Sequence, residues 1–243
     1  MPTDSGDFHP GPVAIQPGKH GDHAHVAHHP YLQHHFDDMG QQAEASTLGM
    51  WVFLVTEIMF FGGLFMAYLV YRHAQPLGFQ EASHHLNVYW GTANTAILII
   101  SSLTMALAVR AAQTNQSVGT QLTLILSTMA LGAAFLGIKA IEYTDKFRDH
   151  IVPGSNFQWE GTYPKAAEQF YSLYFAMTGL HALHMIIGLG IMTWLAIMTW
   201  KKTFSSEYYT PVEVAGLYWH FVDIVWIFLF PLLYLIGRHY HAA

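Results

Sequence analysis

Five ionisable side chains lie inside long apolar segments of this sequence, and their types could do chemistry. Glu57 lies deep in the first of these segments, His181 and His184 share the fourth, and His220 and Asp223 share the last. Within each pair the residues are three positions apart, so on a helix both side chains lie on one face. A buried carboxylate can hold a proton or react covalently, and histidines bind metal ions or haem and relay protons.

Each of these residues also has a structural interpretation. Glu57 could be a hydrogen-bonded residue that joins two helices rather than a reactive carboxylate. Two histidine ligands of one haem usually come from facing helices, so for His181 and His184 we expect hydrogen bonds to Glu57, to Asp223 or to backbone. Asp223 is expected to pair with a histidine or lysine of another helix, because an ionisable group in hydrocarbon is costly without a partner. Together with His220, these residues form the candidate buried polar cluster.

Two further groups of residues could carry charge or bind ions. Lys139 and Glu142 lie three positions apart near the end of the third apolar segment, where the spacing predicts a salt bridge at the membrane interface. Histidines near the N-terminus could bind copper or zinc but lack a fixed scaffold; they are His9, His20, His23, His25, His28, His29, His34 and His35. The absence of cysteine excludes disulfides, thiolate-held zinc or copper, and iron–sulfur clusters held by this chain.

The elements that position these residues are predicted to be transmembrane helices. The chain has 243 residues, of which 52% are hydrophobic and only 11% charged, whereas about 25% are charged in a typical soluble domain. Five segments reach the roughly 20 apolar residues that a spanning helix needs, at about 47–71, 88–112, 119–143, 168–200 and 212–236. The sequence therefore predicts an all-α membrane protein, a five-helix bundle over residues 46–240.

The remaining segments are polar. Residues 1–45 are rich in Pro, Gly and His and are predicted to be a flexible extramembrane tail without a cleavable signal. Residues 144–167 form a long polar loop, a candidate docking surface for another subunit or complex. The net charge of −6 argues against nucleic acid as a partner. No phosphate loop, nucleophile elbow or dinucleotide fingerprint is present, so we expect no self-sufficient active site.

Five sequence motifs, one in each apolar segment, resemble subunit III of the haem–copper cytochrome c oxidases in its five-helix bacterial form. The resemblance covers about residues 46–240 in the family's order, and the last two motifs are the most specific. The motifs are Thr56-Glu-Ile-Met-Phe-Phe-Gly62, Asn94-Thr95, Glu142-Tyr143, Thr178-Gly-Leu-His-Ala-Leu-His184 with Gly188, and Tyr218-Trp-His-Phe-Val-Asp-Ile-Val-Trp226.

The resemblance implies a subunit that carries no haem or copper itself and lies beside the catalytic subunit I, which reduces oxygen to water and pumps protons. It implies bound structural phospholipid, support of proton uptake, and protection of subunit I during turnover. Glu57 matches the family's buried carboxylate that reacts with a hydrophobic carbodiimide. Subunit II is a further expected partner, and small subunits and a cytochrome c-reducing complex are candidates. The implied location is the bacterial inner membrane with a cytoplasmic N-terminus, although the Lys and Arg count weakly favours the opposite orientation.

The chain departs from longer family members, in which two additional N-terminal helices form one wall of a lipid-filled cleft. Several alternatives stay open at this point. The chain could be subunit III of a quinol oxidase, or the related accessory protein of nitric oxide reductase; a partner subunit with a copper site would favour cytochrome c as the donor. A free-standing di-histidine b-type cytochrome would retain haem when expressed alone. An ion transporter would need a continuous polar path, whereas the interior polar residues are grouped in three segments.

Overall fold

The computed structural model describes residues 32–33, 35–204 and 208–235. Over these residues the chain forms six α-helices and a π-helical turn. Five of the helices are long and apolar enough to cross a membrane, which confirms the predicted five-helix, all-α membrane architecture. The elements are α1 (Met39–Ala74), α2 (Pro76–His84), α3 (Val88–Gln113), α4 (Val118–Arg148), α5 (Pro164–Trp200), α6 (Thr210–Phe230) and the π turn η1 (Pro231–Leu235).

Helix α1 begins before the expected boundary near residue 47. The Asp38 carboxylate accepts a hydrogen bond from the backbone N–H of Gln41 at 2.7 Å and caps the helix. The Gln41 side chain accepts in turn from the backbone N–H of Asp37 at 2.7 Å. Residues 39–45, which we assigned to the polar tail, are therefore the first turns of α1. Residues 1–31 and 34 of that tail, and with them all of its histidines except His35, lie outside the described residues.

The two connections at the end of the bundle where α1 stops, between α1 and α3 and between α4 and α5, contain less irregular chain than expected. Helix α2 was not predicted, and it fills most of the connection between α1 and α3. Pro76 occupies its first position, where the missing N–H is not needed, and Phe79 and Ala82 are buried beneath it. Because α4 continues to Arg148 and α5 starts at Pro164, the polar loop comprises residues 149–163.

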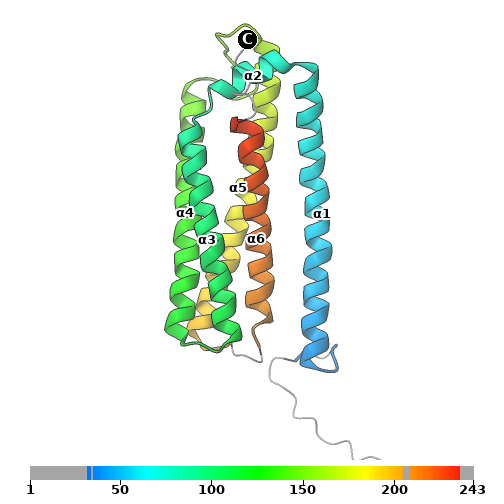
Figure 1. Ribbon diagram of the computed structural model, residues 1–243, viewed down its shortest axis with the longest axis vertical. Helices are drawn as coiled ribbons and strands as arrows, with labels where there is room; N and C mark the ends of the chain where they lie inside the picture. The colour runs from blue at the N-terminus through cyan, green and yellow to red at the C-terminus, as the bar shows by residue number, and fades with distance from the viewer. Residues whose placement is uncertain (1–31, 34, 205–207, 236–243) are drawn as a thin grey trace, which may run out of the picture.

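Helices α3, α4, α5 and α6 form a closely packed antiparallel group, and α1 stands to one side of it next to α5 and α6 (Figure 1). Helix α2 lies across the end of the bundle where α1 stops. In the most apolar part of the span Thr210–Leu235, which comprises α6 and η1, 61% of the residues are buried, whereas the figure for α1 is 17%. Helix α6, which carries the Tyr218–Trp226 motif, therefore lies at the centre of the bundle, and α1 lies at its periphery.

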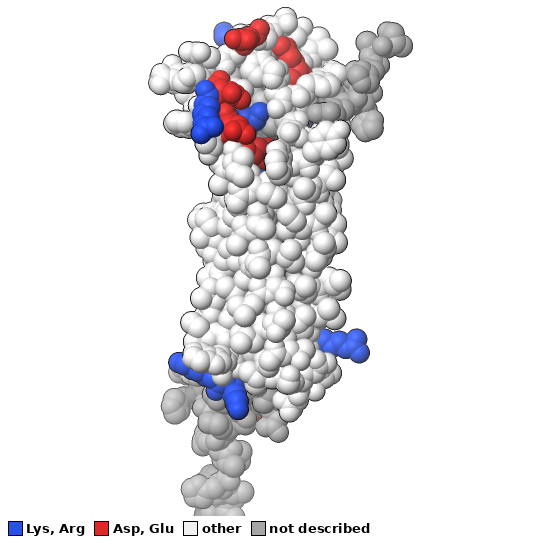
Figure 2. Space-filling view, turned by 90° about the vertical axis from the view of Figure 1, so that its left-hand side faces the viewer, with Lys and Arg blue, Asp and Glu red and all other residues white. Residues whose placement is uncertain are grey.

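Charged side chains are confined to the two ends of the molecule on the face shown in Figure 2, with an uncharged belt between them. This distribution is what the hydrocarbon core of a bilayer requires, because a charge there is costly unless it is paired. The polar residues inside the belt must therefore find partners within the bundle or in another molecule.

Candidate functional site: polar residues inside the bundle

Glu57 of α1 and His184 of α5 form an ion-pair-type contact between the peripheral helix and the core. The distance from His184 Nε2 to Glu57 Oε2 is 3.3 Å. His184 Nδ1 lies 2.9 Å from the carbonyl oxygen of Leu180, which can only accept, so Nδ1 carries a proton and donates it. His184 Nε2 therefore faces the Glu57 carboxylate, which brings an imidazole nitrogen and a carboxyl group together between α1 and α5. The types of these two groups suit them to proton handling.

The surroundings of this pair are aromatic on the inside and apolar on the outside. The His184 ring lies 5.5 Å from the Phe61 ring, and the Tyr218 hydroxyl donates to the His184 carbonyl at 3.0 Å. On the outer side, Ile58 and Phe60 of α1 are exposed and would face lipid or another subunit. Glu57 itself is partly exposed, so the pair can be reached from the surface of the bundle.

His181, on the same face of α5, has a different environment. Its imidazole is buried, and neither ring nitrogen has a hydrogen-bond partner among the described residues. The rings of Phe135 and Trp226 pack against it at 5.4 and 5.1 Å between centroids. His184 therefore makes the expected contacts to Glu57 and to backbone, whereas the prediction of such hydrogen bonds was wrong for His181.

The α6 motif fixes the register between α6 and α3 through three side chains. Trp219 Nε1 donates to Ser101 Oγ at 3.2 Å, and Trp226 Nε1 donates to Thr95 Oγ1 at 3.1 Å. His220 Nδ1 lies 2.7 Å from Ser102 Oγ. Each of these three α6 residues thus contacts a hydroxyl of α3. The two indoles therefore bond to α3 and not to His220 or Asp223.

Asp223 is the exception in this motif. Its side chain is 2% exposed, and neither carboxylate oxygen has a hydrogen-bond partner within the described residues. The expected histidine or lysine from another helix is not there. Instead Asp223 lines a cavity of about 350 Å³ between α3 and α6, together with Ser102 and His220. The five candidate residues thus lie in three places rather than in one cluster.

Sequence analysis predicted only the ion pair of the most complete polar site, and missed its burial and its two tyrosines. Lys139 Nζ donates to Glu142 Oε2 at 2.9 Å, which confirms the predicted salt bridge, but both residues are buried, at 3% and 5% exposure. Lys139 also donates to the hydroxyls of Tyr174 and Tyr234 at 3.1 and 3.2 Å. Both hydroxyls donate to Glu142 Oε1, at 2.9 and 2.6 Å. The Trp226 ring lies 5.2 Å from Lys139 Nζ. The sequence did contain a sign of this site, namely Tyr174 and Tyr234 within apolar segments, because a buried tyrosine hydroxyl needs a hydrogen-bond partner.

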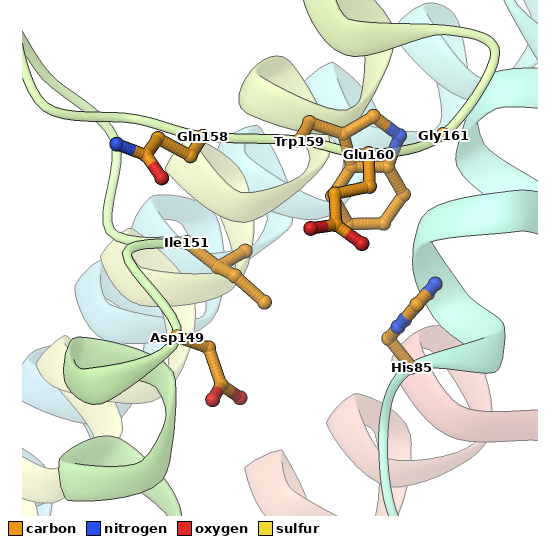
Figure 3. Close-up of a pocket in the computed structure, with 7 residues that line it drawn as sticks. All are labelled: His85, Asp149, Ile151, Gln158, Trp159, Glu160 and Gly161. Carbon is orange, nitrogen blue, oxygen red and sulfur yellow. The ribbon is translucent and has the colours of Figure 1, made fainter.

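A polar pocket of about 500 Å³ lies at the end of the bundle that carries α2 (Figure 3). The carboxylates of Asp149 and Glu160 come from the loop between α4 and α5, and His85 faces them from the α2–α3 connection. Lys146 Nζ donates to the His85 carbonyl at 2.8 Å and ties the two sides together. The lining residues are His85, Asp149, Ile151, Gln158, Trp159, Glu160 and Gly161.

Comparisons with known proteins agree with this arrangement of motifs. The family described as "Cytochrome c oxidase subunit III" matches residues 31–238. The chain is 37% identical over 194 residues to "Cytochrome c oxidase subunit 3" of Corynebacterium diphtheriae, covering 78% of this chain and 87% of that protein. It is 31% identical over 213 residues to "Cytochrome bo(3) ubiquinol oxidase subunit 3" of Pseudomonas aeruginosa, covering 88% and 95%. "Quinol oxidase subunit 3" of Bacillus subtilis is 29% identical over 191 residues, covering 78% and 86%.

The family match spans all five membrane helices, and the relatives of both donor types are covered almost completely. The motifs that carry the resemblance are those that fix the α3–α6 register and join α1 to α5. The chain therefore belongs to the cytochrome c oxidase subunit III family and is subunit III of a haem–copper oxidase.

Proposed function

We propose that this chain is the non-redox subunit III of an aerobic cytochrome c oxidase, where it stabilises the catalytic subunit I and supports proton uptake during the reduction of oxygen to water. The observation that carries this proposal is the contact between the Glu57 carboxylate and the His184 imidazole. It joins the peripheral helix to the core and is reachable from the surface of the bundle. A carboxyl–imidazole pair in that position suits an auxiliary role rather than catalysis.

The choice of cytochrome c as electron donor rests on the motif from Tyr218 to Trp226, which resembles the cytochrome c oxidases most. The relatives include proteins named for cytochrome c and for quinol at similar identities. A quinol oxidase subunit III is therefore the second candidate. For both candidates, haem and copper are proposed to be held by the partner subunits. A copper site in subunit II would favour cytochrome c as the electron donor.

Bound phospholipid is proposed for an apolar groove between α1 and α6. The groove has a volume of about 420 Å³ and is open to the outside of the bundle, as an acyl chain requires. Its lining is apolar except for His220, and it comprises Trp51, Leu54, Ile58, Phe61, Gly62, Phe65, Leu217, His220, Phe221, Ile224, Val225 and Phe228.

We assign the chain to the bacterial inner membrane with the N-terminus of α1 on the cytoplasmic side. Arg110, Lys201 and Lys202 then lie at the cytoplasmic end, and the α2 end with its polar pocket faces outward (Figures 1 and 2). At that outer end, the pocket of Figure 3 is proposed as a docking surface for subunit II, a small subunit or a cytochrome c-reducing complex.

The proposal is tested by purifying the tagged chain from its native membranes in mild detergent. We expect haem- and copper-bearing subunits to co-purify, with cyanide-sensitive oxygen uptake from reduced cytochrome c. Faster uptake with quinol than with cytochrome c would favour the second candidate. Haem that remains on this chain after its partners are stripped away would contradict the non-redox assignment and favour a b-type cytochrome.

The substitution Glu57→Gln should remove the carboxyl group while keeping assembly. The glutamine amide can donate to His184 Nε2, so the contact between α1 and α5 is retained. We expect normal amounts of complex but no labelling of this chain by a hydrophobic carbodiimide, measured by mass spectrometry.

The matched control is Glu44→Gln, which changes an exposed glutamate of the same helix. It should leave the labelling unchanged. Undiminished labelling of the Glu57→Gln chain would show that Glu57 is not the reactive carboxyl.

A further inference from the structure

We propose that Asp223 binds a hydrogen-bond donor on a transmembrane helix of a partner subunit, which packs over the cavity between α3 and α6. The inference rests on the proposed function in one respect: it identifies the partner as the catalytic, haem-bearing subunit. It begins with a carboxyl group that is buried and whose oxygens accept no hydrogen bond from the described part of the chain. An unsatisfied polar group inside a bundle is unfavourable, so a donor from outside the chain would stabilise the assembly.

The neighbours of Asp223 within the chain are already engaged. Trp219 and Trp226 donate to hydroxyls of α3, and His220 is paired with Ser102. Ser102 lies beside the Asp223 carboxyl, but a serine has a single proton. Even if turned toward Asp223, it would satisfy only one of the lone pairs that two carboxyl oxygens carry.

The depth of Asp223 in the membrane excludes a lipid headgroup as the missing donor. At about 1.5 Å per residue, Asp223 lies roughly 18–20 Å from either end of the membrane span Thr210–Leu235. Ser102 is likewise near the middle of α3. Acyl chains, which fill this depth of a bilayer, carry no hydrogen-bond donors. A transmembrane helix can bring a hydroxyl, amide, indole or cationic side chain to the middle of the membrane.

The rim of the cavity has the composition of a helix-packing surface. Exposed apolar side chains surround the polar centre, namely Ile99, Leu103, Ile224 and Ile227. Polar groups inside an apolar seam are a recurrent feature of helix association in membranes. His181 makes the contrast clear: it also lacks a hydrogen-bond partner, but the rings of Phe135 and Trp226 cover it. Asp223 instead lines an open cavity that a neighbouring helix could reach.

The proposed contact surface is continuous with the groove between α1 and α6, because His220 and Ile224 line both cavities. A partner helix over Asp223 would therefore lie next to the groove that we assign to lipid. The surface made by α3, α6 and α1 would then be the side of the subunit that faces subunit I.

The test uses photo-crosslinking of the full-length, tagged chain in native membranes. A benzophenone amino acid replaces Ile224 or Ile99 at the rim of the cavity, and in control variants it replaces Leu126 or Ile141, exposed residues of α4. We expect the rim positions to crosslink to a haem-bearing subunit and the α4 positions to give little or none of that product. Because Asp223 itself is unchanged, the result does not depend on whether a variant at Asp223 folds.

A second measurement compares Asp223→Leu with Asp223→Asn, since asparagine keeps an acceptor oxygen. We expect Asp223→Leu to lower the yield of co-purified haem-bearing subunits about tenfold relative to Asp223→Asn, as loss of one hydrogen bond to a buried donor implies.

The outcomes separate this inference from the proposed function. Co-purification of haem-bearing subunits together with crosslinks to lipid alone, or equal yields for the two Asp223 variants, would overturn the inference and leave the proposed function intact. Crosslinks from the rim to a membrane protein without haem would support the donor helix and overturn the assignment of the partner.

Discussion

Replacing Glu142 by leucine is expected to destabilise the folded chain by about 3–5 kcal/mol, because a buried lysine is then left without its anion. Lys139 is 3% exposed and enclosed by helices α4 and α5 and the π turn. The hydroxyls of Tyr174 and Tyr234 would remain as acceptors for Lys139, but both would lose the carboxylate to which they donate. One substitution would thus remove the acceptor of three hydrogen bonds, one from the Lys139 ammonium and one from each tyrosine hydroxyl.

The measurement is the midpoint temperature of heat-induced aggregation of the tagged chain in native membranes. The double variant Lys139→Met/Glu142→Leu is the control, because it removes both charges and leaves well-packed apolar side chains. We expect the double variant to recover the part of the stability that the unpaired charge costs, while the two tyrosine hydroxyls still lack their carboxylate acceptor. Equal losses in the single and double variants would mean that stranded charge is not the cause.

The second large effect is expected for Trp219→Ala. Trp219 is fully buried, donates to Ser101, and lies between two helices where only glycine leaves room for it. An added Cβ at Gly132 would come within 2.7 Å of the indole, and one at Gly188 within 3.0 Å. Truncation therefore empties a space that three helices share, and we expect a loss of about 3 kcal/mol.

The matched control for this substitution is Trp194→Ala, since Trp194 of α5 is 48% exposed on the outside of the bundle. The same thermal measurement in membranes should place Trp194→Ala close to wild type. If both tryptophan variants lost the same stability, the close packing of Trp219 against Gly132 and Gly188 would not be the cause of the loss.

The helical architecture could be predicted from the sequence because hydropathy is a local property. Each spanning helix can be recognised from the length of its own apolar segment, whatever its neighbours are. The early start of α1 was also readable, because Asp38 followed three residues later by Gln41 resembles a capping box. The Asp38 side chain makes the capping hydrogen bond, and the Gln41 side chain accepts from the N–H of Asp37, one residue before the cap. The early start was missed because residues 39–45 are polar, and apolar length was used as the criterion.

The polar contacts were harder to predict because they depend on how helices pack. His184 and Glu57 were named as candidate partners, and they are in contact. Nothing local indicates that Tyr234 reaches Lys139 across 95 positions of sequence. Nor does the i, i+3 spacing distinguish His184, which is fully paired, from His181, which is enclosed by rings. Spacing gives the face of a helix, but the neighbour on that face comes from the fold.

The peripheral position of α1 bears on the order in which the subunit is built. Its buried residues are Leu54, Phe61 and Tyr68, which recur every seven positions and form a single seam. The Tyr68 hydroxyl donates to the carbonyl of Leu232, 164 positions later in the chain. Helix α1 is synthesised before the other described helices, yet most of its contacts are with α5 and α6, the last described helices of the chain. After insertion into the bilayer, α1 therefore lacks most of its packing contacts until α5 and α6 have been inserted. With so few buried contacts, it is also the helix that separates from the others at the lowest free-energy cost.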